Sequence, residues 1–222
     1  KAADRAAQAV YKLCWNSNYG LLADTPAQKH FSQHANILGT WLDVIPHENQ
    51  KMVLTKILFA SNDAGCAGCS SLPAMTKATY YFRFYLARAT DHAGLDNYLP
   101  LLTPWKVMVS HGLTTWAESP DPSRSDSHAW SAHPNYDLLT IVSGIRPHDP
   151  QFRSVAIQPH LGNLKHVAAT VPHPKGMIET EYVVDGSGVT ARITLPAGIP
   201  GELTWKGKVT SLHKGTQTVH LP

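Results

Sequence analysis

The sequence predicts a two-part protein, in which helical hairpins are followed by an antiparallel β-sandwich. Up to Gly144, apolar residues recur with the period of about 3.6 residues that amphipathic helices have. Beyond Gly144, apolar and polar residues alternate, as in strands with one buried face. The Pro-containing stretch 145–150 between the two patterns is typical of a domain boundary. We therefore expect a helical domain over residues 1–144 and a β-sandwich over residues 145–222.

Several helices are predicted in the first part. A stripe of apolar residues over 3–14 has no lead-in, as if the chain began inside a helix. SQHANILGTWLDVIP, residues 32–46, forms one apolar face that a proline ends, and residues 48–59 follow after a short turn. These two segments should form an antiparallel helical hairpin. Pro73 is placed at the start of PAMTKATYYFRFYLARAT, whose consecutive aromatic residues predict an enclosed inner helix.

Two more helices complete this part. One is expected over residues 95–109, where Pro100 and Pro104 delay or kink it. The last is expected over residues 132–143, with Gly144 at its C-cap. About six helices suffice for an open bundle or for half of a closed ring of helical hairpins, and the pattern does not choose between them.

The second part predicts about seven short strands. The strongest signal is the turn sequence Asp185-Gly186-Ser187-Gly188 between two alternating segments, which predicts a β-hairpin. Strands are expected at residues 154–158, 164–171, 178–184, 189–195, 202–205, 209–212 and 218–221. Seven antiparallel strands of this length make a sandwich.

Composition limits the partners of the chain. The 222 residues are 43% hydrophobic and 16% charged, with a formal net charge of +3. Because the basic residues form no run with interleaved aromatic residues, nucleic acid is not expected as a partner. No apolar run reaches the roughly 18 residues of a membrane span, and residues 1–15 do not resemble a signal peptide. No membrane partner and no cofactor are expected.

The cysteines and histidines do not form a recognisable metal motif. Cys14, Cys66 and Cys69 make no disulfide framework, and the single CAGC has no second ligand pair at zinc-finger spacing. None of the 13 histidines are arranged as HxxxH within a predicted helix, and His128 and His133 are five positions apart across a helix start. We therefore expect no metal.

The stretch 112–134, GLTTWAESPDPSRSDSHAWSAHP, is the candidate functional site. Its prolines and serines interrupt both helical and strand periodicity, and its aromatic content argues against disorder. Glu118 offers one of the two carboxyl groups that hydrolysis of a glycosidic bond needs. Trp116, Trp130 and His128 offer the aromatic platform and the polar contacts of a sugar site.

Each candidate also has an ordinary structural explanation. A single glutamate in a loop is often a solvated surface charge, which makes the neighbouring aromatic residues essential to the argument for Glu118. His128 suits a substrate contact, a metal ligand or a structural histidine. His34, at the start of an apolar helix face, suits a packed histidine better than a ligand. A Ser-His-Asp triad is disfavoured because the sequence has no G-x-S-x-G elbow.

Several segments together resemble the C-terminal part of bacterial α-L-rhamnosidases, glycoside hydrolase family 78. They are SQHANILGTWLDVIP, YYFRFYLARATDHAGLDNYL, TTWAE, SHAWSAHPNYDLL and SGIRPHDPQFRSVAIQP. The resemblance covers nearly the whole chain, and TTWAE followed by SHAWSA at this separation is its specific part. It implies an (α/α)6 barrel followed by a small β-sandwich, and inverting hydrolysis of terminal α-L-rhamnose from rhamnosides.

The resemblance also implies roles for individual residues. Glu118 matches the general base that activates water, and His128 matches a histidine that hydrogen-bonds rhamnose. Trp116 and Trp130 would line the sugar pocket, with His34 as a further candidate contact. The Asp-Arg-Glu cluster near a tryptophan that carries the acid in those enzymes has no counterpart here. The chain is therefore expected to be the second half of a barrel, inactive without its N-terminal half.

Two alternatives remain at this point. The chain could be a non-catalytic carbohydrate-binding or assembly module. It could also belong to another glycosidase on the same barrel, such as one acting on uronic-acid sugars, although the loop supplies only Arg124 to bind a carboxylate. A secreted or periplasmic location would suit breakdown of plant glycosides, and no signal sequence is visible.

Overall fold

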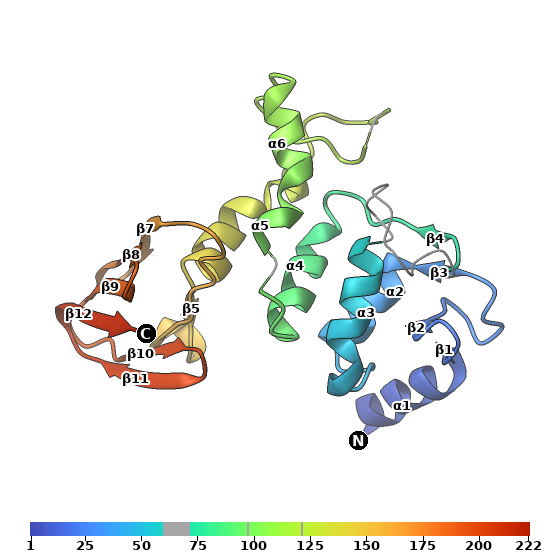
Figure 1. Cartoon of the computed structure of the whole chain (residues 1–222), viewed down its shortest axis with the longest axis horizontal. Coiled ribbons are helices and arrows are strands. Elements are labelled where there is room, and N and C mark those ends of the chain that lie inside the picture. Colours follow the sequence, from blue (N-terminus) through green and yellow to red (C-terminus); the bar gives the residue numbers. More distant parts are fainter. Residues whose placement is uncertain (60–71, 97, 121) are drawn as a thin grey trace. The chain divides into compact units, whose positions relative to one another are not determined.

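The computed structural model describes residues 1–59, 72–96, 98–120 and 122–222. The chain divides into two compact units, Lys1–His133 and Pro134–Pro222. The first is mainly helical and the second is mainly β, so the predicted order of helices first and antiparallel sheet second is confirmed (Figure 1). Cys66 and Cys69 of the CAGC segment lie outside the described residues. Within the described ranges, no helix is both long and apolar enough to span a bilayer.

Helices dominate the first unit, as predicted. They are α1 (Ala2–Cys14), α2 (Gln33–Trp41), α3 (His47–Phe59), α4 (Arg83–His92), α5 (Tyr98–Leu101), α6 (Thr103–Ser110) and the 3-10 helix η1 (Ala129–Ala132). The expectation of helix throughout was wrong in one respect, because two short strand pairs interrupt the helices. Strands β1 (Trp15–Asn16) and β2 (Leu21–Leu22) are antiparallel, whereas β3 (Phe31–Ser32) and β4 (Met75–Thr76) are parallel.

Helix α2 is the centre of this unit and packs against both α3 and α4 (Figure 1). Its Ile37 is fully buried, as are Leu54 and Ile57 of α3. The predicted hairpin of two helices is therefore present as α2 and α3. Asn36, also fully buried, donates to the carbonyl of Leu22 at 2.9 Å and accepts from the amide of Leu22 at 2.9 Å, which fixes α2 to β2.

The helix predicted to start at Pro73 starts instead at Arg83. Residues 72–82 are not helical, because their backbone groups bind elsewhere. Met75 and Thr76 pair with β3, and the amide of Ala78 donates to the buried Gln33 Oε1 at 2.7 Å. The Gln33 amide group also donates to the carbonyl of Ile57 at 2.8 Å. One buried side chain thus ties the segment before α4 to the end of α3.

The last predicted helix, over residues 132–143, is divided into short turns of different pitch. Helix α7 (Pro134–Asp137) continues into the π-helix η2 (Leu138–Val142). Gly144 then takes a left-handed conformation with φ +76°, and a Cβ there would lie 2.2 Å from the carbonyl carbon of Gln158. Only glycine fits this position, because the backbone of Gln158 and Pro159 approaches it closely.

Two four-stranded sheets form most of the second unit. The strands are β5 (Ile145–Pro147), β6 (Val155–Ile157), β7 (His166–His173), β8 (Gly176–Asp185), β9 (Gly188–Leu195), β10 (Gly201–Trp205), β11 (Lys208–Leu212) and β12 (Gly215–Leu221), with the 3-10 helix η3 (Pro150–Phe152) after β5. The sheet orders are β11-β10-β6-β5 and β12-β9-β8-β7. The predicted hairpin joins β8 to β9, whereas β6 and β10 are parallel and not antiparallel as expected.

Both sheets contribute to a single hydrophobic core. Its fully buried members include Ile157 and Leu203 from the first sheet and Tyr182 and Ile193 from the second. The Tyr182 hydroxyl donates to the carbonyl of Ser143 at 2.9 Å, and burial raises the pKa of this phenol. The hydroxyl therefore stays protonated and satisfies a buried carbonyl.

Candidate active site

The loop after α6 doubles back on itself. The amide of His128 donates to the carbonyl of Trp116 at 2.8 Å, and the amide of Glu118 donates to the carbonyl of Ser125 at 2.9 Å. The Thr115 hydroxyl adds a third link, donating to the carbonyl of Asp126 at 2.5 Å. These bonds place the Glu118 and His128 segments side by side, although ten positions separate them in sequence.

A small core anchors this doubled loop to α6. Trp105, Met108 and Ala117 are buried together, with Trp116 packed partly against them. The Trp105 indole donates to the carbonyl of Ser131 at 2.8 Å, which holds the far end of the loop. The described parts of the long connection, on either side of residue 121, are therefore held by burial and backbone bonding, in line with the expectation drawn from its aromatic content.

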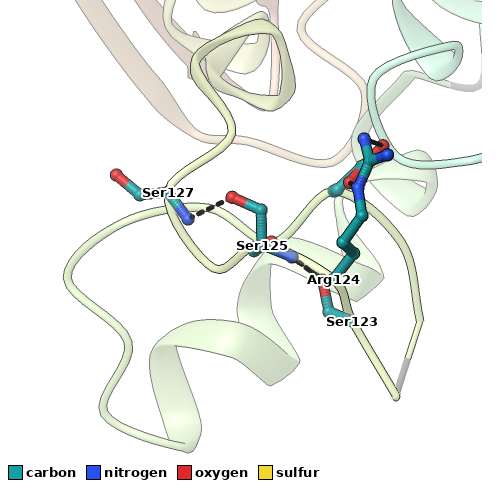
Figure 2. Close-up of polar contacts among 5 residues, drawn as sticks. Ser123, Arg124, Ser125 and Ser127 are labelled. Atoms are coloured by element: carbon teal, nitrogen blue, oxygen red, sulfur yellow. Dashed lines mark hydrogen bonds and ion pairs between the residues drawn. The ribbon is translucent and has the colours of Figure 1, made fainter.

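Glu118 forms a bidentate ion pair with Arg124. The Arg124 Nε donates to Oε2 at 3.0 Å and Nη2 donates to Oε1 at 2.7 Å (Figure 2). The Glu118 side chain is only 15% exposed, whereas that of Arg124 is 82% exposed. Glu118 is thus not the solvated surface charge of the ordinary explanation, although an exposed arginine reaches it from the loop tip.

The serines of the loop tip hold the turn that presents Arg124. The Ser123 hydroxyl donates to the carbonyl of Ser125 at 2.8 Å and accepts from the amide of Ser125 at 3.3 Å. The Ser125 hydroxyl in turn accepts from the amide of Ser127 at 3.3 Å (Figure 2). Hydroxyl groups that bind nearby backbone in this way stabilise turns.

A second link runs from the loop to the segment before α4. The amide of Tyr80 donates to the carbonyl of Glu118 at 3.2 Å. Three residues further on, Arg83 starts α4 with its guanidinium 5.8 Å from the centre of the Tyr80 ring. Burial lowers the pKa of Arg83, and its Nε has no hydrogen-bond partner in the described part of the chain. Sequence reasoning missed this buried cation.

Three of the predicted site residues belong to one aromatic cluster. The His128 and Tyr81 rings are 5.2 Å apart, and Tyr81 and Trp130 are 5.3 Å apart. Trp130 also meets Tyr85 at 6.0 Å, and its side chain lies 48% exposed. The aromatic cluster comprises His34, Trp41, Tyr81, Phe82, Tyr85, His128 and Trp130, and Phe84 adjoins it through Tyr85. Its exposed tryptophan is the kind of surface on which sugar rings stack.

His34 lies at the other end of the cluster. Its ring packs edge-on against Phe82 at 4.3 Å, and Phe82 in turn contacts Tyr85 at 4.8 Å. Partial burial lowers the pKa of His34, with a smaller opposing effect from Asp24. The packed-histidine explanation therefore fits its surroundings.

The aromatic cluster was only partly foreseen. The sequence singled out its histidines and Trp130, but assigned Tyr81, Phe82 and Tyr85 to the interior of a helix. Because α4 starts only at Arg83, Tyr81 and Phe82 precede the helix. Had this later start been expected, these aromatic residues would have been candidates for the functional site. Trp116, by contrast, packs towards the α6 core and not among the rings around Trp130.

Residues 144–220 match the family model of the bacterial α-L-rhamnosidase C-terminal domain. A comparison with curated protein sequences finds no significant match. The family match begins at residue 144, one position before the segment 145–150 where a domain boundary was expected; the boundary itself stays a prediction.

Solved structures of α-L-rhamnosidases share the fold. The family 78 rhamnosidase of Bacillus sp. GL1 aligns with a TM-score of 0.74 and 21% identity, over 90% of this chain and 22% of that one. The Aspergillus terreus α-L-rhamnosidase aligns with a TM-score of 0.72 and 18% identity, over 98% and 26%. The Streptomyces avermitilis enzyme, solved with L-rhamnose, aligns with a TM-score of 0.69 and 16% identity, over 96% and 23%.

The resemblance to the C-terminal part of α-L-rhamnosidases is therefore confirmed. This chain spans about a quarter of the length of the structures it matches.

Proposed function

We propose that the chain is the C-terminal part of an inverting α-L-rhamnosidase, with Glu118 as the general base. In this proposal the helical unit is half of an (α/α)6 barrel and the two sheets of the second unit form a sandwich. The observation that carries the proposal is the doubled loop, which sets the segment of the largely buried Glu118 beside the segment of His128, a member of the aromatic cluster. This chain covers only about a quarter of each related structure, which supports the proposal that a complete active site needs a further segment.

Glu118 suits water activation for a chemical reason. An inverting glycosidase uses one carboxylate to take a proton from the attacking water, and holds it roughly 6.5–9.5 Å from the acid. A carboxylate offers about four lone-pair positions, of which the bidentate Arg124 takes two. The remaining two positions can accept hydrogen bonds from a water.

The sugar would bind at the exposed side of the aromatic cluster. Trp130 offers an indole face, and His128 offers a ring nitrogen that can bind a rhamnose hydroxyl. Trp116 and His34 are weaker candidates for sugar contacts, because Trp116 packs towards α6 and His34 packs edge-on against Phe82. We keep both as secondary contacts in the proposal.

In this proposal, the general acid lies in the N-terminal half of the barrel, and another segment or chain supplies that half. Rhamnose-containing glycosides are the proposed substrates, and secretion or export to the periplasm would suit them. Arg124 does not support the alternative of a uronic-acid substrate, because its guanidinium is already paired with Glu118 and not with a sugar carboxylate.

The first experiment assays this chain alone. Turnover of 4-nitrophenyl α-L-rhamnoside and binding of L-rhamnose by calorimetry are measured on the same preparation. We expect no turnover, because only one of the two carboxyl groups is present. Robust turnover would contradict the proposal that the acid lies elsewhere.

The second experiment separates catalysis from binding. Glu118→Gln is introduced in a polypeptide that also supplies the N-terminal barrel segment, and kcat should fall by about 10² to 10⁴ while rhamnose binding is retained. Glu202→Gln, which changes an exposed glutamate of β10, is the matched control and should leave kcat unchanged. If Glu118→Gln leaves turnover intact, the chain is a binding or assembly module.

A further inference from the structure

Two histidines and a carboxylate meet at the opposite end of α4 from the aromatic cluster. Asp43 lies in the turn between α2 and α3, His47 is the first residue of α3, and His92 is the last residue of α4. The Asp43 Oδ1 lies 2.7 Å from the Nε2 of His92 and 3.5 Å from the Nε2 of His47. One ligand atom from each residue falls within 4.8 Å of the other two.

The carboxylate in this group is held in place by its surroundings. Asp43 adopts a left-handed backbone conformation with φ +54°, a region that aspartate enters more readily than most residues other than glycine. Gln50, which is buried, donates from Nε2 to Asp43 Oδ1 at 2.9 Å and to the carbonyl of Ile45 at 3.0 Å. A buried amide thus orients the exposed carboxylate, as second-layer groups do around metal ligands.

The two imidazoles are arranged in parallel above this carboxylate. The His47 and His92 rings are 5.7 Å apart with 30° between their planes, and both approach Asp43 through Nε2. Their side chains are 73% and 31% exposed. Water and ions therefore reach the group, and the exposed His47 has room to turn.

We propose that Asp43, His47 and His92 form a binding site for one divalent transition-metal ion of the zinc type. Imidazole nitrogen with carboxylate oxygen is a donor set that Zn²⁺ and its first-row neighbours bind well. Ligands at about 2.0–2.2 Å from a tetrahedral zinc lie roughly 3.3 Å from one another. The two separations from Asp43 Oδ1, 2.7 Å and 3.5 Å, lie on either side of this value, so small side-chain rotations would suffice, and a water would take the fourth position.

The bound ion would join the start of α3 to the end of α4. Seven residues separate Tyr85 of the aromatic cluster from His92, which is about 10 Å along a helix. The ion would therefore act as a clamp on the helices that carry the cluster, and not as part of the hydrolytic chemistry. Sequence inspection did not find this site, because position 92 is far in sequence from positions 43 and 47.

The test is titration of the whole chain, first freed of metal by a chelator, with ZnCl₂ in a calorimeter. We expect one strong site per chain and a higher melting temperature with the ion bound. His47→Ala and His92→Gln should each weaken binding at least tenfold and abolish the rise in melting temperature. His111→Ala removes an exposed histidine of the same unit outside the group, so it should change neither quantity.

A second measurement covers variants that lose stability. Co²⁺ bound by the wild-type chain should give the visible absorption of a four- or five-coordinate site, and Gln50→Ala should weaken its binding by about 10- to 100-fold. Circular dichroism confirms that each variant is folded. The proposal is overturned if Zn²⁺ binds with no defined stoichiometry, or if His111→Ala lowers the affinity as much as His92→Gln.

Discussion

The guanidinium of Arg124 binds both carboxylate oxygens of Glu118, and thereby joins the tip of the 112–134 loop to its base. The pair unites an exposed side chain with a largely covered one. This relationship has different consequences for stability and for chemistry. An ion pair with an exposed partner contributes at most about 1 kcal/mol to folding, but it decides the orientation of a carboxylate that the proposed reaction uses.

Replacing Arg124 by Gln should therefore have a modest effect. We expect the free energy of unfolding to fall by less than about 1 kcal/mol, and kcat of the completed enzyme to fall by no more than about fivefold. Arg124→Lys keeps the charge but not the two-pronged geometry, so it should lie between wild type and Arg124→Gln. Steady-state kinetics and urea denaturation measure both effects. A loss as large as that of Glu118→Gln would mean that Arg124 itself takes part in the chemistry.

Trp130 should contribute to sugar affinity. Trp130→Ala removes the exposed indole of the aromatic cluster, and the dissociation constant for L-rhamnose should rise roughly tenfold, or about 1.4 kcal/mol. Trp130→Phe retains an aromatic face and should recover part of this loss. Calorimetry on the polypeptide with a complete barrel measures the constant, with Trp205→Ala in the second unit as the control. Unchanged rhamnose affinity in Trp130→Ala would place the sugar elsewhere.

His34 should make the first unit less stable in mild acid. Burial lowers the pKa of His34 in the folded chain below its ordinary value of 6.5, so the unfolded chain binds the proton more readily. The contribution of the neutral ring is complete above about pH 6.5 and is lost as pH falls towards the folded pKa.

Urea denaturation at about pH 7.5 and about pH 5.5 tests this effect. Wild type should lose more stability than His34→Gln between the two pH values, whereas the exposed His111→Gln should behave like wild type. An equal loss in wild type and His34→Gln would show that this ring does not contribute to the pH dependence.

Substituting Gly144 and Gly207 separately by Ala tests whether a close backbone contact adds to the cost of a positive φ in the β unit. Both have positive φ, +76° and +80°, but a Cβ at Gly207 meets nothing within 4 Å, whereas one at Gly144 overlaps the backbone of Gln158. Gly207→Ala should cost about 1–2 kcal/mol from backbone strain alone. Gly144→Ala should cost about 1–3 kcal/mol more, because the backbone at Gln158 and the substituted residue must move apart. Thermal and urea unfolding measure the difference, and equal costs would refute the close approach.

The spacing of apolar residues predicted helices and strands correctly where one apolar face of the segment is buried. The α2 and α3 hairpin and the β8 and β9 hairpin were predictable, because their burial follows the local spacing of apolar residues. The start of α4 was not predictable from spacing. Backbone pairing with β3 and with the buried Gln33 holds residues 75–78 out of the helix, and both partners lie more than 40 positions earlier in sequence.

The candidate site divides in the same way. The sequence by itself determined which loop carries the carboxylate and which aromatic residues accompany it, since residue type and loop character are local properties. Only the tertiary structure decided that Trp130 faces Tyr81 and Tyr85, that Arg124 covers Glu118, and that His92 reaches Asp43. These contacts depend on chain reversals and on helix packing, and neither leaves a pattern in the spacing of residues.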